Sequence, residues 1–401
     1  MAVDGWRYRK SHSLSGSTTD YQIQITVRYG AGTSSGSTVY LDSKCATDFS
    51  DIRFTNSSGT ELSYWRESYT SSDVAIFWVK IPTISSDTTI YLYYGKSGAS
   101  TTSDGDATFI LFDHFDGSTL DSEKWTSGGS VVIDGSYCKL DASGDYIRSI
   151  SVFGCDTAIR TSMIHYAANQ SAMGYCIGTT SGFTYPFIAF NYQATRSFAY
   201  SAVSGTLQSN TLLSAPSGTT KIFDIYREGN NATKFYDSGS LVATHNTAAN
   251  IPTGDINVRI GLLGAVTYNT DWILVRKLSA SPPTQGSWGS EEEIPTATRS
   301  FRSDYSIEID LQSEFDSIYD IEFVLATATF ESIYDIGAIY TAEFVSPYDI
   351  EIIGVVFESP YSILIFTLFE TYVSGGPSMY KEFRSRIESV TGIVAQFEEI
   401  L

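Results

Sequence analysis

Positive charge is scarce in this sequence of 401 residues. Lysine and arginine together number 25, against 45 aspartate and glutamate residues, which gives a formal net charge of −20. A chain with this charge is repelled by phosphate backbones, so we expect no nucleic-acid partner. The acidity would suit divalent cations, but a solvated acidic surface is the simpler explanation.

Cysteine and histidine are also scarce. The four cysteines, Cys45, Cys138, Cys155 and Cys176, form no CxxC motif, which argues against a zinc or thioredoxin-type site. A Cys138–Cys155 disulfide and buried free thiols both remain open. The histidines at positions 12, 114, 165 and 245 lack ligand spacing, and no GxSxG, HExxH or phosphate-cradling loop occurs. We therefore assign no catalytic residue.

Long apolar runs are absent as well. The first residues, "MAVDGWRYRKSHSL", contain no secretory apolar core. The longest late apolar stretch, "ILIFTLF", is far short of the ~20 residues that span a bilayer. We therefore expect no membrane insertion and no conventional export signal. Either a leader was removed, or the protein reaches the outside by another route, such as incorporation into a virus particle.

Aromatic residues, by contrast, are abundant, with 27 tyrosines and 23 phenylalanines. Such side chains suit a pleated, half-buried surface, so the composition predicts an all-β fold. Residues 1–108 contain short alternating segments such as "YQIQITVRYG", which predict a β-sandwich. Residues 109–278 contain a second set of strands. The Pro-, Gly- and Ser-rich residues 279–300 are predicted to be a linker.

Residues 301–375 repeat a short phrase. "FDSIYDIEF" begins at Phe315 and recurs as "FESIYDIGA", "FVSPYDIEI" and "FESPYSILI". Apolar residues alternate with a period of two in each copy, which predicts strands with one apolar face. One such strand cannot bury its face alone, whereas several repeats or several chains can. The segment resembles the β-repeats of viral fibre shafts.

The residues 378–401 change period. Apolar side chains follow at intervals of 4, 3, 4, 3 and 4, as in the a and d positions of a coiled coil. These six oligomerisation candidates are Phe383, Ile387, Val390, Val394, Phe397 and Leu401. The pattern predicts a short terminal helix and a homo-oligomer. A trimer is favoured and a dimer remains open, as does a helix that docks on its own chain.

The first segment carries ordered aromatic and aspartate landmarks. They are "WRYRK" (6–10), "DFSDIRFTNSSGTELSYWRE" (48–67), "AIFWVKIP" (75–82) and "TIYLYYGK" (89–96). In this order they resemble a β-sandwich family of unknown function from archaeal and bacterial surface proteins. The resemblance implies that a concanavalin-like lectin domain follows.

The second segment opens with "DHFDGSTLDSEKW" and closes with "DWILVRKL". These ends resemble the concanavalin A-like lectin/glucanase jelly roll. Glucan-cleaving enzymes of that architecture carry an ExDxxE strand, whose paired carboxylates perform the hydrolysis. The middle strands here contain no such triad, so we expect no enzyme.

The same resemblance implies a structural calcium ion. Asp271 matches an aspartate near the final strand, and Asp113 and Asp116 are the candidates near the first strand. Calcium takes several oxygen ligands, including carbonyls, so the sequence shows only part of such a site. Alternatively, Asp271 bonds to the backbone.

Sugars in such sandwiches stack on aromatic rings, with amides fixing their hydroxyl groups. The stretch "GFTYPFIAFNYQ" therefore makes Tyr185, Asn191 and Tyr192 carbohydrate-binding candidates, although core packing is the alternative. Together these features predict a non-enzymatic virion fibre or tail protein that binds a host surface glycan and contacts other virion proteins. A cell-surface adhesin or extracellular filament subunit is the alternative, and a polysaccharide-active enzyme is less favoured.

Overall fold

The computed structural model describes most of the first 294 residues and short stretches beyond them. The described ranges are 5–165, 171–177, 184–193, 196–212, 218–262, 264, 267–294, 300–302, 315–316, 329–331, 337–346, 364–373, 382–384 and 398–399. The chain divides into two compact units, Met1–Ile294 and Pro295–Leu401. Within these ranges, helix is limited to α1 (Gly105–Thr108) and one 3-10 turn (Ala248–Asn250), which confirms the all-β fold class.

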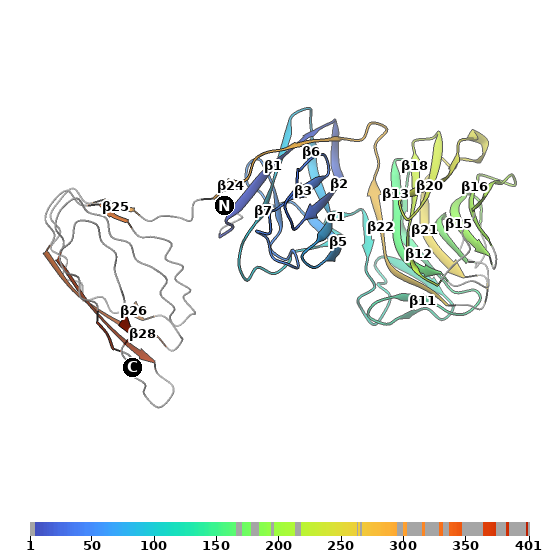
Figure 1. Ribbon diagram of the computed structural model, residues 1–401. Helices are drawn as coiled ribbons and strands as arrows, with labels where there is room; N and C mark the ends of the chain where they lie inside the picture. The colour runs from blue at the N-terminus through green and yellow to red at the C-terminus, as the bar shows by residue number, and fades with distance from the viewer. Residues whose placement is uncertain are drawn as a thin grey trace. The chain divides into compact units, whose positions relative to one another are not determined.

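The first unit begins with a two-sheet sandwich (Figure 1). One sheet contains β1 (Tyr8–Ser15), β4 (Arg53–Asn56) and β7 (Thr88–Tyr94), and the other contains β2 (Thr18–Arg28), β3 (Thr38–Tyr40), β5 (Tyr64–Thr70) and β6 (Val74–Ile84). Because side chains alternate along β2, Ile23, Ile25 and Val27 all point into the core, which also contains Phe54 and Phe77. The sequence-predicted strands of this region are therefore confirmed.

The segment after the second sandwich returns to the first, so residues 284–294 of the linker predicted over 279–300 belong instead to the first sandwich. The strands β23 (Thr284–Trp288) and β24 (Glu292–Glu293) both pair antiparallel with β1. The Trp288 ring stacks on His12 with centroids 4.0 Å apart, and the hydroxyl of Tyr94 donates to Glu291 over 2.7 Å. These strands lie at a sheet edge, which explains their few apolar residues.

The second sandwich is inserted between β7 and β23. Its eight-stranded sheet contains β8 (Leu111–Asp113), β10 (Val132–Ile133), β11 (Cys138–Leu140), β13 (Thr157–His165), β18 (Thr220–Glu228), β19 (Ala232–Asp237), β20 (Ser240–His245) and β22 (Tyr268–Lys277). Its seven-stranded sheet contains β9 (Trp125–Gly128), β12 (Tyr146–Phe153), β14 (Ser171–Cys176), β15 (Phe187–Gln193), β16 (Arg196–Ala202), β17 (Gln208–Leu212) and β21 (Ile256–Leu262). A large apolar core fills the space between the two sheets.

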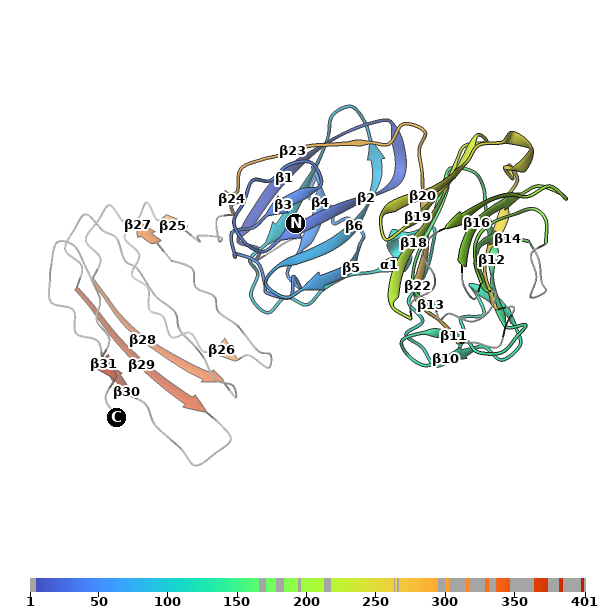
Figure 2. The same ribbon diagram turned by 45° about the vertical axis from the view of Figure 1, so that its right-hand side comes forward.

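Aromatic side chains join the two sandwiches. Trp65 and Trp78 of the first sandwich form one buried cluster with Phe109, Phe112 and Trp272. The Trp65 ring lies 5.0 Å from both the Phe112 and the Trp272 ring centroids, in edge-on geometry. The central strands β8, β18 and β22 of the eight-stranded sheet are therefore covered on both faces, by the partner sheet and by the first sandwich (Figure 2).

A charged group lies beside this aromatic cluster. Arg160 of β13 donates from Nε and Nη2 to Glu67 of the first sandwich, over 3.2 and 2.9 Å, and from Nη1 to Asp224 over 2.7 Å. The Asp224 carboxylate is almost fully buried. Burial raises the pKa of Asp224, and the charge of Arg160 opposes that shift. One guanidinium is therefore shared by carboxylates from both sandwiches.

The described strands of the second unit pair in step with the sequence repeats. Strand β25 (Ser300–Arg302) pairs parallel with β27 (Thr329–Glu331), β26 (Phe315–Asp316) with β28 (Gly337–Ser346), and β28 with β29 (Leu364–Val373). Phe301 is opposite Phe330, and Phe315 is opposite Phe344. Phe315, Phe330 and Phe344 each begin a repeat, and "FRSDYSIEI" from Phe301 has the same pattern, so these pairs join one repeat to the next but one.

The terminal helix predicted over 378–401 is not shown. The described parts of that range are two short strands, β30 (Glu382–Arg384), which contains Phe383, and β31 (Glu398–Glu399). Three heptads are marginal for an isolated helix, and phenylalanine, valine and isoleucine also favour strands. The other five seam positions lie outside the described residues. Nowhere in the described ranges does a helix have the length and apolar character to cross a membrane.

Candidate functional site

The seven-stranded sheet of the second sandwich has one face that no described strand covers. Along β12, β14, β15, β16 and β21, residues that belong to the core cluster alternate with residues that point away from it. The outward positions, here called the outer face, are Tyr146, Arg148, Ala172, Gly174, Cys176, Phe187, Ala189, Asn191, Phe198, Tyr200, Ala202, Asn257, Arg259 and Gly261. Phe187, Asn191 and Arg259 are 5%, 3% and 2% exposed, whereas Arg148, Phe198 and Tyr200 are half-buried, so the face is only partly accessible.

Aromatic rings occupy one side of the outer face. Tyr185, which is 42% exposed, stacks on Phe187 with centroids 5.3 Å apart and an interplanar angle of 27°. Phe198 and Tyr200 of the next strand stack on each other at 5.4 Å, and both are half-buried. Rings that are supported below and exposed above are suited to stacking against a flat apolar ligand surface.

The three carbohydrate candidates divide between the two sides of the sheet. Tyr185 lies at the exposed end of β15, and Asn191 lies on the outer face but is 3% exposed. Tyr192 points the other way, into the core, where its ring stacks with Phe190 and meets Phe223 edge-on. Adjacent strand residues face opposite sides, so Asn191 and Tyr192 cannot both contact one ligand. The prediction for Tyr192 is corrected accordingly.

Exposed apolar side chains gather where these strands end. Ile177 follows β14, Val203 follows β16, and Leu207 precedes β17, and all three are about two-fifths exposed. Tyr185, which precedes β15, lies at the same end of the sheet, because β14 and β15 pair antiparallel and β14 ends where β15 begins. The outer face thus has an apolar margin beside its aromatic rings, as sugar-binding surfaces have.

Two arginines occupy the other side of the outer face. Arg148 of β12 and Arg259 of β21 are directly opposite each other in the strand register. Arg148 is half-buried and Arg259 is 2% exposed. The guanidinium of Arg259 lies over the Tyr146 ring at 4.9 Å. Neither arginine was singled out from sequence, since they are far apart along the chain and only the register brings them together.

No outward position of the outer face carries Asp or Glu in the part of the chain that the structure describes. Hydrolysis of glycosidic bonds uses a pair of carboxyl groups on either side of the scissile bond in most enzymes. The described outward positions of this face therefore include no such pair.

The three calcium candidates are engaged in other contacts. Asp113 accepts from the Phe115 main chain over 2.8 Å and from Trp125 Nε1 over 2.7 Å, and burial raises the pKa of its carboxyl. Asp116 contacts His114 Nδ1 at 2.7 Å, and Asp271 accepts from the Ser162 hydroxyl over 3.2 Å. Across the described ranges, no three His, Cys, Asp or Glu side chains form a group suited to a metal. The calcium prediction gains no support here.

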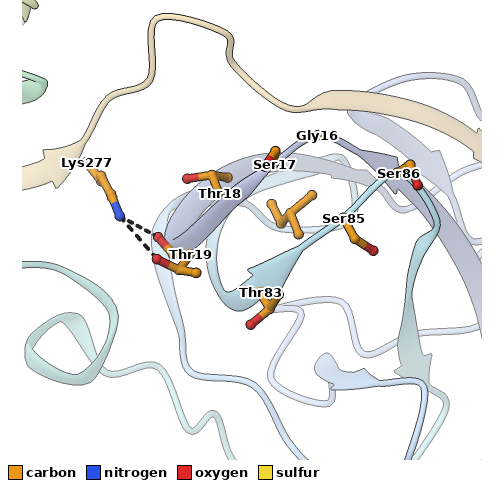
Figure 3. A pocket seen from close by; sticks show the side chains of 9 residues that line it. Gly16, Ser17, Thr18, Thr19, Thr83, Ser85, Ser86 and Lys277 are labelled. Carbon is orange, nitrogen blue, oxygen red and sulfur yellow. Dashed lines mark hydrogen bonds between the residues drawn. The ribbon is translucent and has the colours of Figure 1, made fainter.

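A shallow, open pocket of about 730 Å³ lies between the sandwiches (Figure 3). Hydroxyl-bearing side chains line it, among them Ser17, Thr18 and Thr83. The Lys277 ammonium group at its border donates to the main-chain oxygen of Thr19 over 2.8 Å, as the dashed lines in Figure 3 show. Because the lining contains no aromatic ring and its one cation is held by the first sandwich, the outer face is the better ligand surface.

Comparison with known proteins gives one family and a set of solved structures. Residues 48–128 match a domain of unknown function, DUF2341, which agrees with the resemblance expected for the first segment. That match covers β4 to β7 of the first sandwich and the start of the second. None of the curated proteins matches the chain.

The solved structures that match cover about two-fifths of this chain. They include a beta-glucanase of Bacillus licheniformis (14% identity, 42% of this chain and 97% of that one, TM-score 0.34) and beta-agarase A from Zobellia galactanivorans (12% identity, 43% and 90%, TM-score 0.32). A glycosyl hydrolase family protein from Mycobacterium fortuitum matches at 12% identity, over 42% of this chain and 99% of that one, with a TM-score of 0.35. Likeness at this level carries no argument about activity.

Proposed function

We propose that this protein is a non-enzymatic glycan-binding protein and that the outer face is its binding surface. The observation that carries the proposal is the asymmetry of the second sandwich. The central strands of one sheet are covered on both faces, whereas the other sheet carries the partly exposed rings of Tyr185, Phe198 and Tyr200 and an apolar margin. Aromatic stacking on sugar rings needs such a surface, and the lack of outward carboxylates favours binding over hydrolysis.

A glycan array incubated with the full chain tests this proposal. Tyr185→Ala is expected to weaken binding about fivefold, because an aromatic contact contributes about 1 kcal/mol. The matched control is Tyr69→Ala, which removes a ring of similar exposure (49%) from the first sandwich and should leave binding unchanged. A protein that retains no glycan, or that tolerates Tyr185→Ala, would contradict the proposal. Release of reducing ends from a bound polysaccharide would instead favour an enzyme.

We further propose that the repeats present the sandwiches on an assembled surface structure, a virion fibre or tail, with other virion proteins and a second and third copy of the chain as partners. The support is the in-step pairing of the repeats, which is how structural β-segments are built. A cell-surface adhesin or filament subunit remains the alternative, and immunogold labelling of virions and of cell walls distinguishes the two.

Self-association through the second unit has a direct measurement. Light scattering of the full chain is expected to give about three times the chain mass of 44.0 kDa, and residues 1–294 alone should give a monomer. The expectation follows from the apolar repeats, which cannot each bury a face within a single strand. A monomeric full chain would rule out the trimer.

A further inference from the structure

Four aromatic rings of the outer face form a row on β15 and β16. Tyr185 and Phe187 stack with centroids 5.3 Å apart, and Phe198 and Tyr200 stack at 5.4 Å. Phe187 belongs to a small apolar cluster against which Tyr200 packs. The two stacked pairs therefore follow one another on neighbouring strands.

The strand register gives this row its direction. Tyr200 is a diagonal neighbour of Phe187 in the pairing of β15 with β16, within reach of an aromatic side chain. Phe198 is two residues further in the same direction, opposite Asn191. The row from Tyr185 to the level of Asn191 thus covers six residue steps, about 20 Å at ~3.4 Å per residue.

No comparable row crosses the strands among the described outward positions. Beside Phe198, the positions on the next three strands are Asn191, Ala172 and Gly261. An aromatic ring recurs at Tyr146 of β12, beyond those three strands. A ligand that contacts several rings in succession therefore has to lie along β15 and β16.

Three of the four rings present surface to a ligand. Tyr185 is 42% exposed, and Phe198 and Tyr200 are half-buried, whereas Phe187 is 5% exposed. Phe187 therefore supports its neighbours and offers little surface of its own. A ligand that spans the row meets Tyr185 at one end and Phe198 at the other.

Hydroxyl groups accompany the rings on the edge strand β17. Ser209 and Thr211 are exposed and lie opposite Tyr200 and Phe198 in the register. Both point outward, because Asn210 between them turns inward to a histidine of β20. Rings for the apolar faces of sugars, with hydroxyl groups beside them for the sugar hydroxyls, are the elements of a polysaccharide site.

From this row we infer that the protein binds an internal stretch of an extended, linear polysaccharide, which lies along β15 and β16 and contacts Tyr185, Tyr200 and Phe198 in turn. Chains of β-1,4-linked sugars have this ribbon shape, in which each ring presents an apolar face. A sugar extends such a chain by roughly 5 Å, so the row of about 20 Å matches about four consecutive sugars. The inference rests on the proposed glycan binding and specifies its ligand class and orientation.

Titration calorimetry of the full chain with oligosaccharides of increasing length tests the inference. The probes are β-1,4-linked oligosaccharides of glucose, mannose and xylose, from the monosaccharide to the octasaccharide. The matched control is the α-1,4-linked glucose series, whose chains coil. In a β-linked series, affinity is expected to rise about fivefold for each further ring that the chain reaches and to level off near the tetrasaccharide. The α-linked series should show no such rise.

Tyr185→Ala and Phe198→Leu remove the rings at the two ends of the row. Each should lower the affinity for the tetrasaccharide and longer chains about fivefold and make it level off at a shorter chain. A chain that crosses the strands would meet at most one of these rings, so an effect of both variants establishes the orientation. Phe198→Leu keeps apolar volume, and its melting temperature shows whether the sheet is intact. Thr211→Val, which removes an exposed hydroxyl group at the same end, should also weaken binding of the longer chains.

The outcomes separate this inference from the proposed function. No binding of any β-linked series, affinity that is independent of length, an equal rise in the α-linked series, or full binding of long chains by a folded Phe198→Leu protein would each overturn the inference. Glycan binding by the outer face would stand in all four cases if the wider array shows it. Failure to bind any sugar on that array would remove the proposed function itself, and the inference with it.

Discussion

Replacing Arg160 with methionine is expected to lower the free energy of unfolding of the first unit by about 3–5 kcal/mol, since a buried pair that loses one partner leaves an uncompensated charge. Here two carboxylates would lose their common partner: the Glu67 side chain is 8% exposed and that of Asp224 is 3% exposed. Urea titration of the full chain, followed by tryptophan fluorescence, measures the loss. Tryptophan fluorescence reports on this site because the Trp78 indole N–H donates to Glu67 over 2.5 Å.

Two further variants show whether buried charge causes this effect. Arg28→Met breaks a surface pair whose side chains are 41% and 59% exposed, and should change stability by less than about 1 kcal/mol. Adding Glu67→Gln and Asp224→Asn to Arg160→Met removes the stranded charges and should recover a large part of the loss. A stable Arg160→Met protein, or a triple variant no better than the single one, would contradict the assignment.

Ending the chain at Leu278 is expected to unfold the first sandwich while the second retains its fold. The truncation removes β23 and β24, which leaves the backbone of β1 unpaired along one edge and uncovers His12, a residue that is fully buried. The loss is expected to reach about 5 kcal/mol, comparable with the entire stability of a small domain. Limited proteolysis should cut the first hundred residues in this variant and spare them in the parent.

The control for this truncation is a chain that ends at Ile294, which retains both strands and should resist proteolysis as the full chain does. A peptide of residues 279–294 added in trans should restore part of the protection, since the missing edge strand can pair again through its main chain. Indistinguishable cleavage of the two truncated chains would show that β23 and β24 are dispensable to the sandwich.

Local patterns predicted the strands but not their partners. The alternation of Ile23, Ile25 and Val27 was sufficient to predict β2, because a strand with one buried face has apolar residues at every second position of its own sequence. The strand β23, with the sequence TQGSW, shows little of this alternation. It lies at an edge and pairs with β1, more than 260 residues earlier, and no local pattern contains information about a contact of that range.

The candidate site shows a similar division. Alternation in "FIAFNYQ" separates the residues into two sets but does not say which set faces the core, which is why Tyr192 was misplaced. Arg148 and Arg259 each appear in sequence as one charged residue within an apolar strand, in "YIRSI" and "VRIGL". That is a weak signal of the side of the strand that points away from the core. Their proximity depends on a register that only the folded sheet supplies.

The parallel pairing in the second unit relates the number of repeats to the length of the segment. Partners such as Phe315 and Phe344 are 29 residues apart, and Gly337 and Leu364 are 27 apart, so each strand added to the pairing requires two repeats. Each increment advances the segment by one strand spacing, about 4.8 Å. Because equivalent positions of the repeats are paired, an added repeat can place its phenylalanine opposite that of the repeat two before it. The number of repeats therefore sets the number of paired strands.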